Sequence, residues 1–282
     1  MGAQAKRQDL FGRRTFVAFD TETTGMFAVS NRLVEIAAIK FSPGSDDIRT
    51  FESLIDPERS MPAEVIGIHG ITDNMVAGAE KAEAVLSRFV EFLDPEDILI
   101  AHNAPFDIAF LGCEFRRAEM KSLDNLILDT VDIYRRLYPE QLSYSLLALS
   151  QSLGLANQQE HRAMADAVLV KRLLERSMER MPPVESPGEL HDLLSVYTMD
   201  SVRLDVGELP DEYADITLAI NEGRQLEIVY ASRGGQPRPR VIRPFQIHAL
   251  RSAIYLNAFC ETARAERTFR LDRIERFRLL PD

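Results

Sequence analysis

Cysteines and long apolar stretches are scarce in this sequence, and their scarcity excludes several classes of protein. Only Cys113 and Cys260 are present, too few for a disulfide framework or a cysteine-based metal site. No apolar run approaches the roughly 18 residues of a membrane-spanning helix, and the opening MGAQAKRQDLFGRR has no apolar signal core. With 282 residues, 45% of them apolar, we expect a globular cytoplasmic protein of about two domains that does not bind membranes.

Positive charge is also scarce, which at first argues against a nucleic-acid partner. The formal net charge is −11, whereas phosphate-binding proteins usually carry a basic patch. The distribution changes this interpretation. Residues 1–211 hold 21 Lys and Arg against 35 acidic residues, but residues 212–282 hold 12 Arg and no Lys against 9 acidic residues. The first part of the chain is therefore acidic, whereas the second carries a small excess of positive charge.

Hydrophobic patterns predict an α/β domain over residues 10–181. Apolar runs predict buried strands, and apolar residues at helical spacing predict helices between and after them. The expected strands are Phe16–Phe19, Leu33–Phe41, Thr50–Ile55, Asp97–Ala101 and a short one around Leu126–Leu128. The expected helices are Ala82–Leu93, Phe106–Met120, Thr130–Leu137, Ser145–Leu153 and Ala163–Met181.

A linker and a smaller, mostly β domain are expected after this. Residues 182–211 begin with PPVESPGE and are rich in acidic residues, so we expect a linker with a short helix near Leu190–Val196. Residues 212–282 combine one helix, about Glu212–Glu222, with alternating runs such as LEIVYAS and AIYLNAFC. The Gly234-Gly235 pair between two of these runs is typical of a hairpin.

Acidic residues follow the first strand in the stretch FVAFDTETTG. Asp20 and Glu22, at i and i+2, project to the same side of a strand. Two carboxylates at one point repel each other unless a cation neutralises them, and oxygen ligands suit Mg²⁺ or Mn²⁺. An isolated pair of this kind is more often a solvated turn. Asp107 in HNAPFD, and His161 and Asp166 in EHRAMADA, also have ordinary explanations as residues of a first helical turn.

Taken together, FDTETTG, HNAPFD and HRAMADA resemble the three motifs of the DEDD exonucleases, of the type found in bacterial polymerase proofreading subunits, with the histidine variant of the third motif. IHGIT, LDT and SLLALSQSLGL resemble the segments between them. The resemblance implies a ribonuclease H-like mixed sheet flanked by helices. It further implies two divalent ions, Mg²⁺ or Mn²⁺, held by Asp20, Glu22, Asp107 and Asp166, with His161 as general base. It also implies that Glu64 and His69 line the pocket of the terminal nucleotide.

Residues 212–282 resemble a WYL domain, a small SH3- or Sm-like β-barrel found in regulators that sense nucleic-acid ligands. RVIRPF, AIYLNAFC and RTFRLDRI follow the family order, although Ile254 stands where the family has Trp. The resemblance implies a ligand-contacting set drawn from five arginines: Arg267, Arg270 and Arg273, with Arg240 or Arg243. Arginine suits phosphates and bases, but such a stripe is also common on a solvated surface, and Asp272 is placed to pair with a neighbour.

Our leading hypothesis is a 3′→5′ exonuclease that releases nucleoside 5′-monophosphates from single-stranded DNA or RNA ends, with the WYL-like domain binding the strand or a regulatory ligand. The sequence leaves open whether the sugar is deoxyribose or ribose. One alternative is a ligand-sensing nucleic-acid-binding regulator without turnover, although such a protein has no need of His161. Another is a proofreading subunit bound to a DNA polymerase, which the WYL-like extension ranks below a free-standing repair or RNA-processing nuclease.

Overall fold

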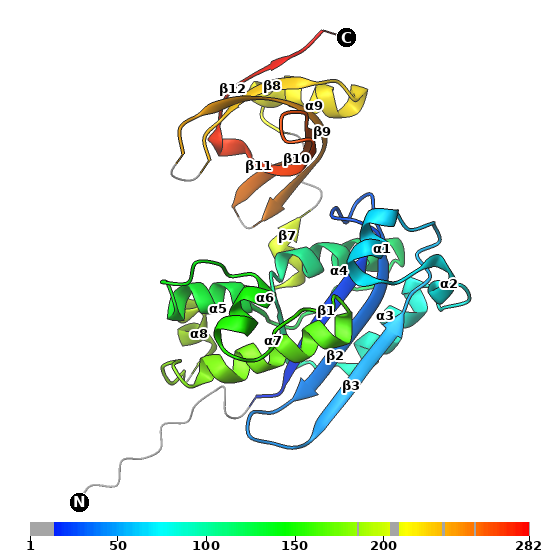
Figure 1. The fold of residues 1–282 in the computed structure, drawn as a ribbon, viewed down its shortest axis with the longest axis vertical. Helices are drawn as coiled ribbons and strands as arrows, with labels where there is room; N and C mark the ends of the chain where they lie inside the picture. Colours follow the sequence, from blue (N-terminus) through cyan, green and yellow to red (C-terminus); the bar gives the residue numbers. More distant parts are fainter. Residues whose placement is uncertain (1–13, 185, 204–208, 233–234, 251, 282) are drawn as a thin grey trace, which may run out of the picture. The chain divides into compact units, whose positions relative to one another are not determined.

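The computed structural model describes residues 14–184, 186–203, 209–232, 235–250 and 252–281 (Figure 1). These residues form two compact units, and the chain passes from the first to the second between Asp200 and Ser201. Residues 10–13 of the predicted first domain, and Gly234 of the predicted hairpin, lie outside the described residues.

The first unit is built on a mixed six-stranded sheet in the order β3-β2-β1-β4-β5-β6. Strands β1, β2 and β3 are antiparallel, β4 and β5 run parallel to β1, and β6 returns antiparallel to β5. Every residue of β2 is buried, as its apolar pattern predicts for a central strand. The strands are β1 (Phe16–Thr23), β2 (Leu33–Phe41), β3 (Ile48–Leu54), β4 (Ile98–Ala101), β5 (Ile127–Asp129) and β6 (Val196–Tyr197).

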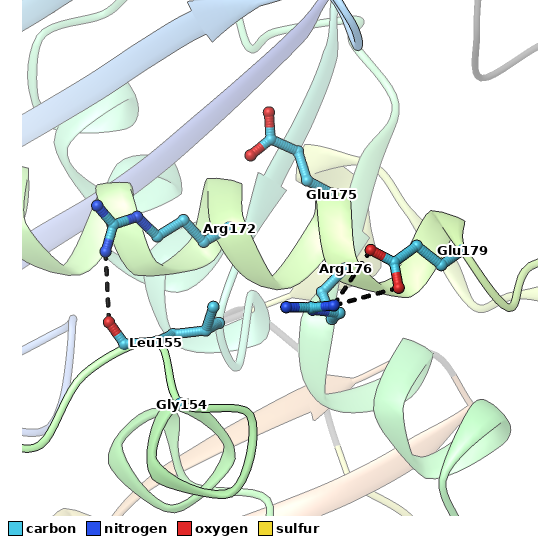
Figure 2. A pocket seen from close by; sticks show the side chains of 6 residues that line it. All are labelled: Gly154, Leu155, Arg172, Glu175, Arg176 and Glu179. Carbon is cyan, nitrogen blue, oxygen red and sulfur yellow. Dashed lines mark hydrogen bonds and ion pairs between the residues drawn. The ribbon is translucent and has the colours of Figure 1, made fainter.

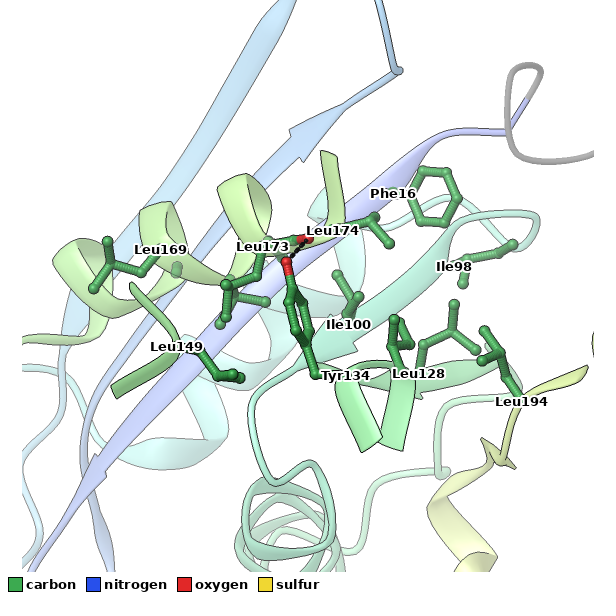
Figure 3. Packing of buried hydrophobic residues seen from close by; sticks show 14 of the residues in the cluster. Phe16, Ile98, Ile100, Leu128, Tyr134, Leu149, Leu169, Leu173, Leu174 and Leu194 are labelled. Atoms are coloured by element: carbon green, nitrogen blue, oxygen red, sulfur yellow. Dashed lines mark hydrogen bonds between the residues drawn. The ribbon is translucent and has the colours of Figure 1, made fainter. Parts of the chain in front are cut away.

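Helices bury both faces of this sheet. On one face, α7 packs against β1 and β2, and Tyr134 donates a hydrogen bond to the Leu173 carbonyl oxygen at 3.0 Å within the apolar cluster of Figure 3. On the other face, the ring of Phe19 lies 6.4 Å from that of Phe89. The helices are α1 (Ala63–His69), α2 (Asp73–Val76), α3 (Ala82–Phe92), α4 (Pro105–Arg117), α5 (Thr130–Leu137), α6 (Leu146–Ser152), α7 (Ala163–Met178) and α8 (Pro187–Leu193). The predicted α/β class, a mixed sheet flanked by helices, is confirmed.

The segment after α7 differs from the predicted linker over 182–211. Val184, Leu190 and Leu194 are buried in the apolar cluster of the first unit, and β6 pairs with β5. The short helix expected near Leu190–Val196 is α8, which ends at Leu193. The described residues of 182–200 therefore belong to the first unit, because their apolar side chains share its buried cluster.

The second unit is an antiparallel sheet around a small core of its own. The strand order is β11-β10-β9-β8-β12, with β7 beside β9, and Ile216 of α9 packs with Ile228 and Leu256. Its elements are β7 (Val202–Arg203), α9 (Ala214–Glu222), β8 (Leu226–Tyr230), β9 (Arg238–Leu250), β10 (Ala253–Cys260), β11 (Ala265–Arg270) and β12 (Ile274–Leu279), with a 3₁₀ turn η4 (Leu271–Arg273). The predicted mostly β second domain is confirmed. No helix within the described ranges has the length and apolarity to cross a bilayer.

Candidate active site

Asp20 and Glu22 lie on the last part of β1, which extends four residues beyond the predicted end at Phe19. The strand continues because Asp20 pairs with Ala37 and Glu22 with Glu35 on β2, and the register shifts only between Glu22 and Thr23. Both side chains are half-buried and project on the same side of the strand. The rigid strand thus presents two carboxylates at the end of the sheet.

Asp166 lies in the first turn of α7 and completes a cluster of three acids. Ligand oxygens of Asp20, Glu22 and Asp166 all lie within 4.8 Å of one another. Gln159 donates a hydrogen bond from Nε2 to Asp166 Oδ2 at 2.6 Å. The other oxygen, Oδ1, is buried and has no hydrogen-bond partner among the described residues. An unsatisfied buried carboxylate oxygen beside two further carboxylates fits a cation ligand.

Asp107 is placed beside these acids by the turn that begins α4. Asn103 has a left-handed backbone (φ 64°), and its N–H donates to Asp129 Oδ1 at 2.8 Å, which fixes the HNAPFD turn. Asp107 itself is only 2% exposed, and Thr21 Oγ1 donates to its Oδ1 at 2.6 Å. Its carboxylate is not part of the three-acid cluster, but its charge raises the pKa of Asp20. The second motif therefore lies beside the cluster and is held by Thr21.

Burial raises the pKa of each of the four acids, and repulsion from the other acids adds to this at Asp20 and Glu22. Burial, followed by the charges of Asp107 and Glu22, holds the pKa of Asp20 well above its usual range. Burial and Asp166 raise the pKa of Glu22 to about 8. Burial also raises the pKa of Asp107 to about 7, although the Thr21 hydrogen bond opposes it, and raises that of Asp166. Without a cation, Glu22 and Asp107 hold protons near neutral pH, and the carboxylate donor set fits hard divalent ions.

His161 precedes α7 in a left-handed conformation, with φ of 50°. Such a conformation is strained for a residue other than glycine, and it persists only where surrounding contacts hold it. The charge of His161 acts on the pKa of Asp166, so the imidazole and the carboxylate are close in space. The third motif thus brings its predicted base and its predicted ligand to the same place.

His69 and Glu64 both lie on α1, but in different surroundings. His69 is 4% exposed, and its Nδ1 accepts a hydrogen bond from the Ile71 N–H at 3.0 Å. Burial lowers its pKa, and the charge of His161 lowers it further, so His69 lies near the third motif. Glu64 is exposed in the first turn of the helix. Of these two predicted pocket residues, only His69 is held in place by burial and a hydrogen bond.

The strand β2 contributes a buried acid that the sequence patterns do not reveal. Glu35 is fully buried and accepts hydrogen bonds from Arg162 Nε at 3.1 Å and from the Ala163 N–H at 2.9 Å. In VEIAAIK it stands alone among apolar residues, so its position opposite Glu22 emerges only from the strand register. Gln159 is also missed, because a polar residue in a loop carries no pattern.

A separate pocket of about 350 Å³ is lined by α7 and its end and by the loop that follows α6 (Figure 2). Its charged groups are paired: Arg172 donates to the Leu155 carbonyl oxygen, and Arg176 lies 3.3 Å from the Glu179 carboxylate. None of the predicted catalytic residues lines it. The lining residues are Gly154, Leu155, Arg172, Glu175, Arg176 and Glu179.

The five predicted arginines of the second unit do not share one face of the sheet. Arg240 is paired in register with the core residue Ile228, whereas Arg243 is paired with the exposed Phe259. Arg267 lies opposite Ala258 and Arg270 opposite Tyr255, again on different faces, while Arg273 is half-buried in η4. The ligand-contacting set therefore stays a prediction.

Several of these arginines already have partners. Arg270 pairs with Asp272 at 2.9 Å, as expected from the sequence, and Arg243 lies 3.5 Å from Glu261. Arg240 Nε is buried without a hydrogen-bond partner among the described residues. Ile254, which replaces the family's Trp, packs against the core of the unit.

Comparison with known proteins agrees with this geometry. Residues 17–174, more than half of the chain, match the RNase_T family model, described as "Exonuclease", and residues 211–279 match the WYL domain. The chain is 35% identical over 179 residues to DNA polymerase III PolC-type of Listeria welshimeri, and 39% over 160 residues to that of Streptococcus thermophilus. These alignments cover 64% and 57% of this chain but only 12% and 11% of the polymerases.

Two solved structures share the fold. Exonuclease I of E. coli in complex with a dA16 oligonucleotide matches with a TM-score of 0.55 and 18% identity, over 88% of this chain and 55% of that one. Cell-death related nuclease 4 matches with a TM-score of 0.52 and 16% identity, over 66% of this chain and 81% of that one. The three motifs, their geometry and the family match agree, and the chain belongs to the exonuclease family, with a WYL domain after its exonuclease domain.

Proposed function

We propose that the chain is a metal-dependent 3′→5′ exonuclease that hydrolyses single-stranded 3′ ends to nucleoside 5′-monophosphates. The observation that carries this proposal is the cluster of Asp20, Glu22 and Asp166, whose oxygens lie within 4.8 Å of one another at the end of a rigid sheet. Four acids with raised pKa values in one place destabilise a fold unless a ligand compensates for them.

We assign Mg²⁺ or Mn²⁺ to this cluster, held by Asp20, Glu22, Asp107 and Asp166. Carboxylate oxygens are the donors these cations prefer. When bound, two such ions neutralise charge at the scissile phosphate and favour an in-line displacement at phosphorus. This role also explains why an acidic unit acts on a polyanion.

In the proposed reaction, His161 takes a proton from the attacking water. The water oxygen forms a bond to phosphorus as the bond to the 3′ oxygen of the preceding nucleotide breaks, and the departing oxygen acquires a proton from solvent. A neutral imidazole suits this task near pH 7, an effect typically worth about 10²–10⁴ in rate. Glu64 and His69 bind the terminal nucleotide, with buried His69 shaping the pocket and exposed Glu64 at its rim.

The substrate that we propose is a single strand, with DNA and RNA as the two cases to be distinguished. The exonuclease I structure contains a dA16 oligonucleotide, which supports DNA. We propose that the WYL domain provides a second contact to the strand through its arginines. A tethered second site raises effective concentration only for strands long enough to reach both sites.

The principal test is nucleotide release from labelled single-stranded DNA and RNA with Mn²⁺, Mg²⁺ or EDTA. We expect mononucleotides from the 3′ end, dependent on metal, no detectable release by Asp107→Ala, and release by His161→Ala that is slower by about 10²- to 10⁴-fold but still measurable. Asp97→Asn is the matched control, because Asp97 is a buried acid paired with Lys40 at 2.6 Å rather than with the cluster. Strand binding without any cleavage by the wild type contradicts the proposal and favours the ligand-sensing regulator.

The second contact is tested in the full chain by Arg267→Gln. Arg267 is exposed, and its guanidinium donates to the backbone oxygen of Glu266 at 3.1 Å. We expect KM to rise for long strands but not for tetranucleotides. Arg278→Gln is the control, because Arg278 is an exposed arginine of the same unit whose guanidinium is paired with Glu227 at 2.6 Å. Equal effects of the two variants on long strands contradict a specific contact.

A second candidate function is proofreading for a DNA polymerase, because the relatives are PolC-type polymerases. This role predicts faster removal of a mismatched than of a matched primer terminus, and co-purification with a replicative polymerase. Equal rates on both termini, together with purification as a free protein, favour an independent nuclease.

A further inference from the structure

Glu35 is a fully buried carboxylate that the proposed chemistry does not use. It lies on β2 directly opposite Glu22, within the electrostatic reach of the acid cluster. A buried carboxylate is costly unless donors satisfy it, and Glu35 has three. Arg162 binds its two oxygens through Nη2 and Nε at 2.5 and 3.1 Å, and the Ala163 N–H donates at 2.9 Å. With both oxygens occupied, Glu35 is unsuited to bind a cation.

These contacts fix the start of α7. Ala163 is the first residue of the helix, and Arg162 at the N-cap provides no side-chain cap of its own. Glu35 takes over that task from a neighbouring strand, where a negative charge also complements the helix dipole. His161 immediately precedes this anchored pair in its left-handed conformation, and Asp166 follows in the first turn. The anchor therefore ties the third motif to the strand beside the first motif.

The pair adds little net charge to the cluster. Glu35 raises the pKa of Glu22, and Arg162 lowers it, so the two influences oppose each other. Arg162 is about a third exposed, but its guanidinium is directed to Glu35 in a bidentate arrangement. The contribution of this pair to the surrounding residues is therefore the fixed geometry of its two hydrogen bonds rather than its charge.

We propose that Glu35 and Arg162 are positioning residues that hold the His161 imidazole in place for proton transfer. This inference rests on the proposed function. The strained backbone of His161 needs external support, and the fork with the Ala163 hydrogen bond provides it within two residues. Loss of the fork lets His161 relax toward an ordinary conformation and moves its imidazole away from the reacting water. Displacements of about 1 Å can cost about 10²-fold in rate.

The experiment combines Glu35→Gln with His161→Ala in the full chain, assayed at saturating Mn²⁺ and with varied single-stranded DNA. Glutamine keeps the size of the side chain and an acceptor for the Ala163 N–H, but it faces the guanidinium with an amide. We expect kcat to fall by about 10- to 100-fold and KM to stay within about twofold. In the His161→Ala background, we expect Glu35→Gln to cause no further loss, because the residue acts through His161.

A matched control distinguishes positioning from general stability. Asp97→Asn breaks the buried ion pair between Asp97 and Lys40. Lys40 is on β2, as Glu35 is, but lies at the opposite end of that strand. It should lower the melting temperature without lowering kcat. Arg162→Lys keeps the charge but loses the fork, and we expect an intermediate loss of kcat. If Glu35→Gln does not fold, Arg162→Lys in the wild-type and His161→Ala backgrounds decides the question in the same way.

Each adverse outcome has a distinct meaning. Additive losses of kcat in the wild-type and His161→Ala backgrounds overturn the positioning role. A rise in KM with unchanged kcat also overturns it, and assigns Arg162 to phosphate binding. Unchanged kcat in both Glu35→Gln and Arg162→Lys also overturns it. A wild-type protein that binds strands without cleaving them contradicts the proposed function itself, which is a separate failure.

Discussion

The two units of this protein treat charge in opposite ways. The first unit gathers four buried or half-buried acids near one another, none of them in an ion pair with a lysine or arginine among the described residues, and their pKa values are raised. The second unit is rich in arginine, but Arg243, Arg270 and Arg278 each have an acidic neighbour within 3.5 Å. Charge that the fold leaves uncompensated marks the site more clearly than charge that is abundant. The net charge of −11 therefore says little about the partner.

The strongest test of this contrast replaces one acid of the cluster. Asp107→Asn keeps the shape of the side chain and removes a buried charge. Replacing a residue that only supports a metal ligand typically costs about 10- to 100-fold, so loss of a proposed ligand should lower kcat by more than about a hundredfold. In metal-free buffer the same variant should melt at a higher temperature than the wild type, because repulsion is removed. Activity assays and thermal unfolding in EDTA measure both effects. A lower melting temperature would contradict the view that the cluster is strained.

A second test uses pH. The pKa of Glu22 is raised from 4.5 to about 8, so the folded protein holds a proton that the unfolded chain releases between these values. The unfolding free energy of the metal-free protein should therefore fall as pH rises from about 5 to 8. Saturating Mn²⁺ should flatten this dependence. Urea titrations at several pH values measure it, and a stability that rises over this window contradicts the assignment.

The same contrast predicts an unusual arginine in the second unit. Arg240 Nε is buried without a hydrogen-bond partner among the described residues, and the Nη1 of the same guanidinium donates only to Cys260 Sγ, at 4.0 Å. Arg240→Met removes this unsatisfied group and keeps the apolar stem, so stability should be unchanged or higher by about 1 kcal/mol. Denaturant unfolding of the full chain is the measurement. A clear loss of stability means that the Arg240 guanidinium has a stronger partner than Cys260 Sγ.

The smallest effect is expected at an exposed pair. Arg270 and Asp272 pair on the surface, where solvent screens their attraction. Arg270→Gln should leave the melting temperature within error of the wild type at 0.15 M salt. A measurable drop would show that exposed arginines of this unit support its fold, which would make the two units more alike in their use of charge.

The sequence predicted those site residues that lie within motifs of fixed order and spacing. Asp20, Glu22, Asp107, His161 and Asp166 stand in ordered motifs, and the apolar runs around them predicted their strands and helices. Glu35 could not be predicted, because its significance depends on a cross-strand neighbour, and Arg162 appeared only as part of a motif. Both depend on which residues become adjacent after folding.

The linker between the domains was the least predictable region. Its proline and acidic residues are typical of an exposed connection, and the predicted short helix near Leu190–Val196 gave no sign that Val184, Leu190 and Leu194 are buried against the first unit. The two residues of β6 are too few for any periodicity. The surface that they cover exists only once α5, α7 and β5 are in place.

That short strand has a consequence for solubility. β5 is fully buried and apolar apart from its final aspartate, and β6 pairs with its outer edge through Val196 and Tyr197, while Tyr197 is anchored to Asp132 at 2.8 Å. An uncovered apolar edge strand invites pairing with a second chain. A shortened protein that stops at residue 181, where the helical pattern ends, should therefore aggregate, whereas one that continues to residue 200 keeps its edge covered.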